Sequence, residues 1–227
     1  PAAYQVLKQR LEEIEPQFGI PGNRVFYLAI PPRLIGVCAQ QLKAAGLVQD
    51  EAADGPFSRI IVEKPIGRDL QSAREVNEIL GECFAEQQIY RIDHYLAKET
   101  IQNLLVFRFA NAIFEPIWNR HYIESVHITA AEKLGVGSRA GFYEQAGVLR
   151  DMFQNHLLQL VTLVGMEPPA SFNADALRNE KVKVLSAIQP INGEQVAYNT
   201  VRAQYRGYLN EPDVKANSTT PTYAALR

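Results

Sequence analysis

Apolar residues gather in blocks of two kinds along the first half of the chain. Residues 25–30 are a continuous apolar run with β-branched and aromatic members, and 59–63 hold a shorter β-branched run between Arg59 and Glu63. Each is followed by a stretch with apolar residues every three or four positions. The short runs are typical of strands buried on both faces, and the periodic stretches are typical of helices. We therefore predict strands at 25–30, 59–63 and 89–95, and helices at 4–14, 34–45, 70–84 (capped by Asp69) and 99–109.

Buried strands that alternate with helices indicate a parallel α/β sheet covered on both sides. Ligands of such sheets bind beyond the carboxyl ends of the strands, so Pro31-Pro32, Glu63-Lys64-Pro65 and Asp93-His94-Tyr95 should meet on one edge. No Gly-x-Gly-x-x-Gly or comparable phosphate loop occurs in the 227 residues. We therefore expect the C-terminal half of a Rossmann-like dinucleotide domain, without its first half.

The pattern changes after Asn111. Partial alternation predicts a strand at 122–132 that is exposed on one face, and strands and helices no longer alternate in a βαβ rhythm. This indicates the beginning of an α+β domain with a mainly antiparallel sheet. We divide the chain into a partial coenzyme-binding domain, 1–93, and the N-terminal part of a substrate and dimerisation domain, 94–227. The further elements predicted are helices at 143–164 and 175–188, a strand at 200–206 and a loop at 210–222.

Composition narrows the class of protein. The chain is 47% hydrophobic and 21% charged with a net charge of −2, which excludes the strongly basic footprint of a nucleic-acid binder. Cys38 and Cys83 fall in predicted helices without metal-ligand spacing, so we expect free buried thiols and no metal site. No run approaches the 18 or so apolar residues of a membrane span. We expect a cytoplasmic protein that binds no membrane.

The segment from Tyr90 to Lys98 crowds an acid, an imidazole and a phenol together before a lysine in the first turn of a predicted helix. A cation there opposes the helix dipole unless an anion sits between the lysine and the free amides, so the segment predicts a phosphate site. Taken singly, these residues have ordinary explanations: a helix cap for Asp93, a core or surface histidine for His94 and a solvated charge for Lys98.

Two other segments carry candidate chemistry. Proline after Lys64 restricts the backbone of the lysine and orients its ammonium toward the strand-end crevice, although Glu63-Lys64 is equally explained as the first solvated residues past the sheet. On the predicted helix 143–164, Asp151 and Asn155 are i, i+4 neighbours on one face. His156 lies about 140° around from Asp151, at the border of the apolar stripe, where a core-edge histidine is the alternative.

Three segments together resemble the signatures of glucose-6-phosphate dehydrogenases. They are Arg-Ile-Asp-His-Tyr-Leu-Ala-Lys at 91–98, Ile-Val-Glu-Lys-Pro-Ile-Gly-Arg-Asp-Leu at 61–70 and Arg-Asp-Met-Phe-Gln-Asn-His-Leu-Leu-Gln at 150–159. Ile66 stands where phenylalanine is common, and Ala97 stands where glycine is usual and crowds the backbone near the phosphate. The resemblance implies transfer of a hydride from glucose 6-phosphate to NADP, with NAD possible, in the first step of the pentose phosphate pathway.

The resemblance also implies a role for each candidate residue. Oxidation of the sugar C1 hydroxyl releases a proton, which suits an imidazole that titrates near neutrality, and a carboxylate can fix the tautomer of that imidazole. His156 is then the general base and Asp93 its orienting partner. The remaining implied roles are phosphate binding by His94, Tyr95 and Lys98, sugar contacts by Glu132, Asp151 and Asn155, a place between sugar and nicotinamide ribose for Lys64, and coenzyme contacts by Pro31 and Pro32.

Two hypotheses remain open from the sequence. The first is a dehydrogenase, incomplete as given, which in its complete form is a homo-oligomer (a dimer or tetramer) that binds glucose 6-phosphate. The second is a non-catalytic module that binds a sugar phosphate or serves assembly, having lost the coenzyme loop. Under the first hypothesis we expect the 227-residue chain alone to bind NADP weakly and to show no turnover, because the main pyrophosphate site is missing.

Overall fold

The computed structural model describes residues 1–49 and 55–227, which form two compact units, Pro1–Asp93 and His94–Arg227. Within the described ranges, no helix combines the length and the apolar character needed to cross a membrane. Cys38 and Cys83 are free thiols, the first half-buried and the second buried.

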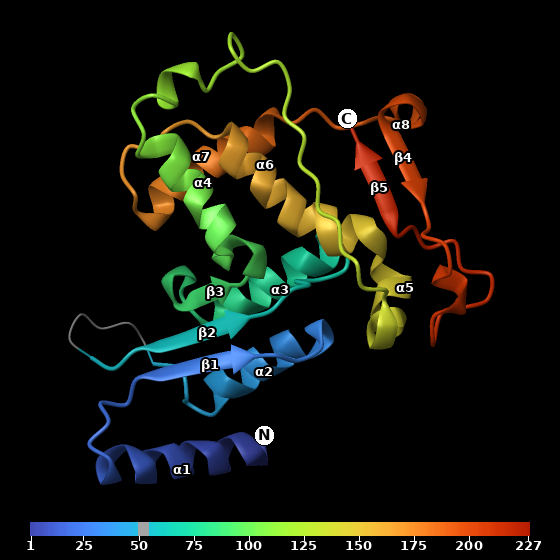
Figure 1. Ribbon diagram of the computed structural model, residues 1–227. Helices are drawn as coiled ribbons and strands as arrows, with labels where there is room; N and C mark the ends of the chain where they lie inside the picture. Colours follow the sequence, from blue (N-terminus) through green and yellow to red (C-terminus); the bar gives the residue numbers. More distant parts are fainter. Residues whose placement is uncertain (50–54) are drawn as a thin grey trace. The chain divides into compact units, whose positions relative to one another are not determined.

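The first unit is a three-stranded parallel sheet in the order β1-β2-β3, with a helix in each crossover. In Figure 1, β1 and β2 run side by side in the same direction. The parallel sheet and its alternation with helices are as predicted. The elements are α1 (Ala2–Gln17), β1 (Arg24–Leu28), α2 (Pro32–Ala44), β2 (Ser58–Val62), α3 (Leu70–Cys83), the 3-10 turn η1 (Glu86–Gln88) and β3 (Ile89–Arg91).

The core of this unit lies on one face of the sheet. Ile35 of α2, Ile60 of β2 and Leu80 of α3 are fully buried in one cluster, so both crossover helices cover the same face. Asp69 begins α3 as predicted: its carboxylate accepts a hydrogen bond from the Ser72 amide at 2.9 Å, and the Ser72 hydroxyl reciprocates in a capping box.

The prediction that the first strand is buried on both faces is wrong. Val25 and Tyr27 are each 55% exposed, whereas Phe26 packs against the core cluster. The cause is the placement of α2 and α3 on one face, which leaves the alternate residues of the edge strand uncovered.

The third strand is shorter than predicted. It ends at Arg91, and the last backbone bond toward β2 joins the Ile92 N–H to the Val62 carbonyl at 3.1 Å. Since β2 itself ends at Val62, the chain beyond Ile92 has no strand to pair with. His94 and Tyr95 therefore belong to a 3-10 turn and not to a strand.

The second unit is mainly helical and carries a two-stranded antiparallel sheet, in which Thr200 pairs with Leu226 and Ala203 with Tyr223. Helix α8 and strand β5 were not predicted, and β4 is shorter than the predicted strand. The elements are η2 (His94–Ala97), α4 (Glu99–Phe109), η3 (Glu115–Ile117), η4 (Gly137–Arg139), α5 (Ala140–Val148), η5 (Leu149–Leu157), α6 (Leu158–Gly165), α7 (Ala174–Ala187), α8 (Gly193–Asn199), β4 (Thr200–Ala203), η6 (Tyr208–Asn210) and β5 (Tyr223–Leu226).

The predicted strand at 122–132 is wrong as well. Residues 123–132 form neither helix nor strand, and in Figure 1 this stretch is the long thread between α4 and α5. Alternation of apolar residues makes a strand only where a neighbour accepts the backbone hydrogen bonds, and β4 and β5 pair with each other.

The predicted continuous helix over 143–164 is broken at Gly147, whose φ of 62° and ψ of 173° are not helical. After the break the chain resumes as η5, a π-helical stretch, and then continues as α6. In η5 the repeat is wider than in an α-helix, and at its end the Leu158 N–H bonds to the Phe153 carbonyl five residues back. A positive φ at Gly147 is a conformation that favours glycine.

A buried arginine joins α4 to the C-terminal end of α6. Arg108 is 5% exposed, and its guanidinium donates to the carbonyls of Leu163 at 2.6 Å and Met166 at 2.8 Å. The Trp118 indole donates to the Val164 carbonyl at 2.8 Å. Burial lowers the pKa of Arg108 from its usual value. These side chains satisfy helix-end carbonyls that would otherwise lack partners.

We predict that Arg108→Met destabilises the second unit by about 3 kcal/mol, because it leaves two buried carbonyls without donors. Trp118→Phe, which removes a single indole bond, should cost only about 1 kcal/mol. Urea unfolding followed by circular dichroism measures both losses. Equal stability of Arg108→Met and the unmodified chain would show that the guanidinium does not hold these helices together.

Candidate active site

The predicted phosphate residues lie in the turn that leads into α4. His94 and Tyr95 are in the 3-10 turn η2, and Lys98 is the residue before the first helical residue, Glu99. His94 and Lys98 are exposed, whereas Tyr95 is buried. The Lys98 ammonium lies 3.5 Å from the centroid of the Tyr95 ring. The cation is thus placed at the start of the helix by contact with an aromatic face.

The imidazole of His156 packs against the same turn. It is 1% exposed, its ring is stacked on the Tyr95 ring with centroids 4.1 Å apart, and it meets the His94 ring edge-on at 4.5 Å. Within the second unit, the structure therefore brings together His156 and the three residues of the predicted phosphate site.

The wide repeat of η5 changes which side chains share a face. Asp151 and His156 are five residues apart in this stretch and are both buried, at 5% and 1% exposure. Asn155 is half-buried, and its side chain bonds to its own helix, donating to the Arg150 carbonyl at 3.3 Å and accepting from the His156 amide at 2.7 Å. The predicted i, i+4 pairing of Asp151 with Asn155 and the separation of about 140° from His156 assumed an α-helical repeat, which this stretch does not have. The pairing itself stays a prediction.

Arg139 is a neighbour of this site that the sequence did not suggest. Its guanidinium lies 3.0 Å from the Asp151 carboxylate, which is almost fully buried, while the Arg139 side chain itself is 58% exposed. The two residues are twelve positions apart on opposite sides of the break at Gly147. No helical spacing relates them, so neither apolar periodicity nor a motif in the sequence predicts this pair.

Tyr143 adds a neutral phenol near Asp151. Burial, followed by the negative charge of Asp151, raises the pKa of Tyr143 to about 12. The phenol therefore stays protonated at neutral pH and acts as a donor, with its hydroxyl 3.4 Å from the Pro221 carbonyl. Glu132 is exposed on the irregular thread, and its charge contributes a smaller part of the same shift.

The predicted coenzyme-side residues belong to the first unit. Leu28 pairs with Val62 and Val62 with Arg91, so the three parallel strands end level with one another. The segments that follow them carry the candidate residues on one edge of the sheet, as predicted. These are Pro31 and Pro32, which are the cap and first residue of α2, Lys64, which precedes a cis peptide bond to Pro65, and Asp93. Asp93 closes the first unit and His156 belongs to the second, and the pairing of their side chains stays a prediction.

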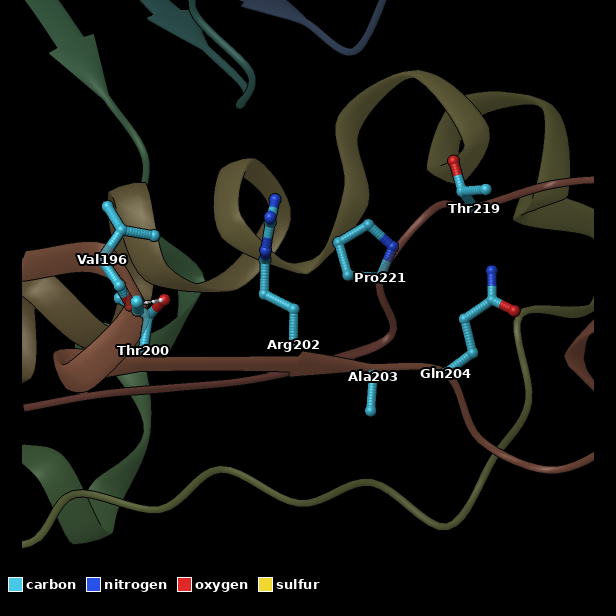
Figure 2. Close-up of a pocket in the computed structure, with 8 residues that line it drawn as sticks. Val196, Thr200, Arg202, Ala203, Gln204, Thr219 and Pro221 are labelled. Atoms are coloured by element: carbon cyan, nitrogen blue, oxygen red, sulfur yellow. Dashed lines mark hydrogen bonds between the residues drawn. The ribbon is translucent and has the colours of Figure 1, made fainter. Parts of the chain in front are cut away.

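A hollow of about 550 Å³ opens beside β4, on the second unit, but it is not the predicted site. None of the candidate residues lines it, and Figure 2 shows the residues that do. Most of this lining is exposed. The ring cluster of His94, Tyr95 and His156 remains the candidate site of the second unit.

Comparisons with known proteins agree along the whole chain. A family profile described as the glucose-6-phosphate dehydrogenase NAD binding domain matches residues 1–103, and the corresponding C-terminal domain profile matches residues 105–227. Glucose-6-phosphate 1-dehydrogenase of Bacillus subtilis is 46% identical over 99% of this chain and 47% of its own length. Glucose-6-phosphate 1-dehydrogenase 2 of Mycobacterium tuberculosis is 45% identical over 99% of this chain and 45% of its own length.

Solved structures give the same result. A glucose-6-phosphate dehydrogenase in complex with its substrate glucose-6-phosphate has a TM-score of 0.85 and 39% identity, covering 98% of this chain and 46% of that one. The enzyme from Mycobacterium avium has a TM-score of 0.82 and 40% identity, covering 96% and 46%. The chain thus spans about half the length of the relatives it matches. It belongs to the glucose-6-phosphate dehydrogenase family.

Proposed function

We propose that this chain supplies the substrate-binding part of a glucose-6-phosphate dehydrogenase, which oxidises glucose 6-phosphate to its lactone. The single observation that carries the proposal is the stack of His156 on Tyr95, beneath the Lys98 ammonium. This arrangement places a candidate base next to a candidate anion site. Membership of the family, and the solved relative that holds glucose-6-phosphate, support the same substrate.

The start of α4 suits the phosphate of the sugar. His94 and Lys98 are exposed there, and the first amides of a helix carry partial positive charge toward an anion. A phosphate between the ammonium and those amides would offset the unfavourable placement of a cation at a helix N-terminus. We propose that Lys98 and His94 contact the phosphate oxygens and that Tyr95 donates its hydroxyl.

The position of His156 suits proton removal from the C1 hydroxyl. In the oxidation, hydrogen leaves C1 as a hydride, with both electrons of the C1–H bond. Hydrogen leaves the hydroxyl as a proton, and the electrons of the O–H bond stay on oxygen. The reaction therefore needs one acceptor for a hydride and one for a proton. The imidazole of His156 offers a ring nitrogen that can accept the proton, and its stack on Tyr95 fixes the plane of the ring. Asp93 is proposed to orient this imidazole, and Asp151, Asn155 and Glu132 to contact sugar hydroxyls.

The hydride requires a nicotinamide dinucleotide, which accepts it from C1 when bound. The residues of the first unit fit such a group in part, because Pro31, Pro32 and Lys64 follow strands that end level on the edge where α/β sheets bind dinucleotides. We propose that Lys64 lies beside the ribose of the nicotinamide.

The finer properties implied by the family resemblance are proposals of the same kind. They are a preference for NADP, with NAD as the alternative, a role in the first step of the pentose phosphate pathway, a cytoplasmic location and assembly as a homo-oligomer. Kinetics with both coenzymes and sedimentation of the complete enzyme would test the first and the last.

We predict that His156→Asn, introduced into the complete dehydrogenase that carries these residues, lowers kcat by about 10²–10⁴-fold, the usual contribution of a general base. Binding of glucose 6-phosphate should change little, because the phosphate contacts remain. His127→Asn, which alters an exposed histidine of the same unit, serves as the matched control. Steady-state kinetics with calorimetric binding separates the two quantities, and unchanged turnover would remove His156 from the role of base.

Lys98→Ala should raise KM for glucose 6-phosphate about 10–100-fold with a smaller effect on kcat, since a charge-assisted contact is lost alike from ground and transition states. Lys183→Ala, at a side chain that is 69% exposed on α7, is the control. The phosphate site requires that unphosphorylated glucose bind much more weakly than glucose 6-phosphate to the unmodified protein. Equal binding of the two sugars would contradict it.

A further inference from the structure

The break at Gly147 creates a new helix start in the middle of the site. The first amides of any helix lack acceptors within it, so the helical segment that begins after Gly147 and carries His156 needs acceptors from elsewhere. One is supplied from far along the chain: the Val148 N–H donates to the Pro221 carbonyl at 3.1 Å. The placement of this helix start therefore depends on the placement of Pro221.

Pro221 is the last residue of segment 218–221, which is hydrogen-bonded to Glu144 of α5. The Glu144 carboxylate oxygen Oε1 accepts hydrogen bonds from the Ser218 and Tyr208 hydroxyls, each at 2.6 Å. The Thr220 hydroxyl lies 3.4 Å from the Glu144 carbonyl. Tyr208 is 1% exposed, so the bond between its hydroxyl and this carboxylate involves a buried donor.

The same segment is held from its other side by the end of β4 and by Gln204, the residue that follows the strand. The Gln204 amide donates to the Ser218 and Thr220 carbonyls, both at 2.9 Å, and the Thr222 N–H donates to the Ala203 carbonyl at 2.9 Å. Figure 2 shows Pro221 beside the strand that ends at Ala203, with Gln204 directly after it. Segment 218–221 is thus fixed between the small sheet and α5.

The approach at the break is close. A Cβ added at Gly147 would lie 3.6 Å from both Pro221 and Thr220, and the residue has a positive φ. Glycine therefore permits the turn of the backbone, and segment 218–221 fills the space beside it.

We propose that Glu144 is a positioning residue for His156. Acting through Ser218 and the Pro221 carbonyl, it fixes the start of the helical segment that carries Asp151 and His156. The effect of Glu144 on catalysis rests on the proposed function. Its effect on the helix start rests on the geometry alone.

A carboxylate suits this position because one of its oxygens accepts from two hydroxyls at once. The bond from Ser218, and then the bond from Tyr208, hold the pKa of Glu144 below its usual value, so the group is ionised at neutral pH. Hydrogen bonds to an ionised acceptor are about twice as strong as neutral ones. Glutamine would keep one acceptor oxygen, whereas alanine would leave both hydroxyls without it.

The structural part is tested by amide hydrogen exchange on the 227-residue chain. In Glu144→Ala we expect exchange within 148–157 to accelerate about tenfold, the effect of losing a buried acceptor, with Glu144→Gln close to the unmodified chain. Glu211→Ala removes another carboxylate bonded to a hydroxyl, that of Tyr205, without touching segment 218–221, and should leave 148–157 unchanged. Equal acceleration in all three variants, or in none, would overturn the proposal.

The catalytic part is tested in the complete dehydrogenase. Glu144→Ala should lower kcat about tenfold with KM for glucose 6-phosphate little changed, because His94 and Lys98 lie on another element, and Glu144→Gln should restore kcat. A loss confined to KM, or no rescue by glutamine, would overturn it. If Glu144→Ala does not fold, Ser218→Ala carries the same comparison. Absent turnover in the unmodified enzyme would refute the proposed function, while the exchange result would still decide the positioning role.

Discussion

The wide helical repeat between Leu149 and Leu157 decides which side chains of this segment share a face. In an α-helix Asp151 would lie above Asn155, and His156 would lie a third of a turn or more away. In the π-helical stretch the carboxylate and the imidazole are five residues apart and both turn inward. Stretches of this kind are rare and are found frequently at functional sites, where other contacts offset their poorer hydrogen bonding. Here those contacts include the Tyr95 stack on His156 and the Arg139 pair with Asp151.

Both ends of this long helical segment are held by groups that are remote in sequence. At its start the Val148 amide bonds to the Pro221 carbonyl, and at its end Arg108 donates to the carbonyls of Leu163 and Met166. Arg108 stands in α4, the helix that directly follows the η2 turn and Lys98, where the candidate phosphate residues lie. The C-terminal end of the helix and the candidate anion site are therefore joined through α4, so a change at this helix end can reach the site without touching substrate.

The sequence predicted the parts of the fold that depend on local signals. The helix cap at Asp69, the parallel strands and α4 were recovered because capping and apolar periodicity act within a few residues. The prediction of a strand at 122–132 was wrong because a strand also needs a hydrogen-bonded neighbour. The π-helical stretch was not predicted because its slightly wider repeat does not visibly change the spacing of apolar residues. Of the candidate site, the motifs identified His94, Tyr95, Lys98 and His156, which lie together, but the Arg139 contact with Asp151 crosses a helix break and has no sequence signature.

The contact of Tyr95 with His156 is the most direct test of this account, and nuclear Overhauser spectroscopy on the chain with labelled histidine and tyrosine measures it. We expect cross-peaks between the ring protons of the two residues and an upfield shift of the His156 ring resonances, as stacking at 4.1 Å requires, with both features lost in Tyr95→Leu. Absence of these cross-peaks in the folded chain, together with the i, i+4 contact pattern of a regular α-helix along 149–157, would contradict the wide repeat and the site built on it.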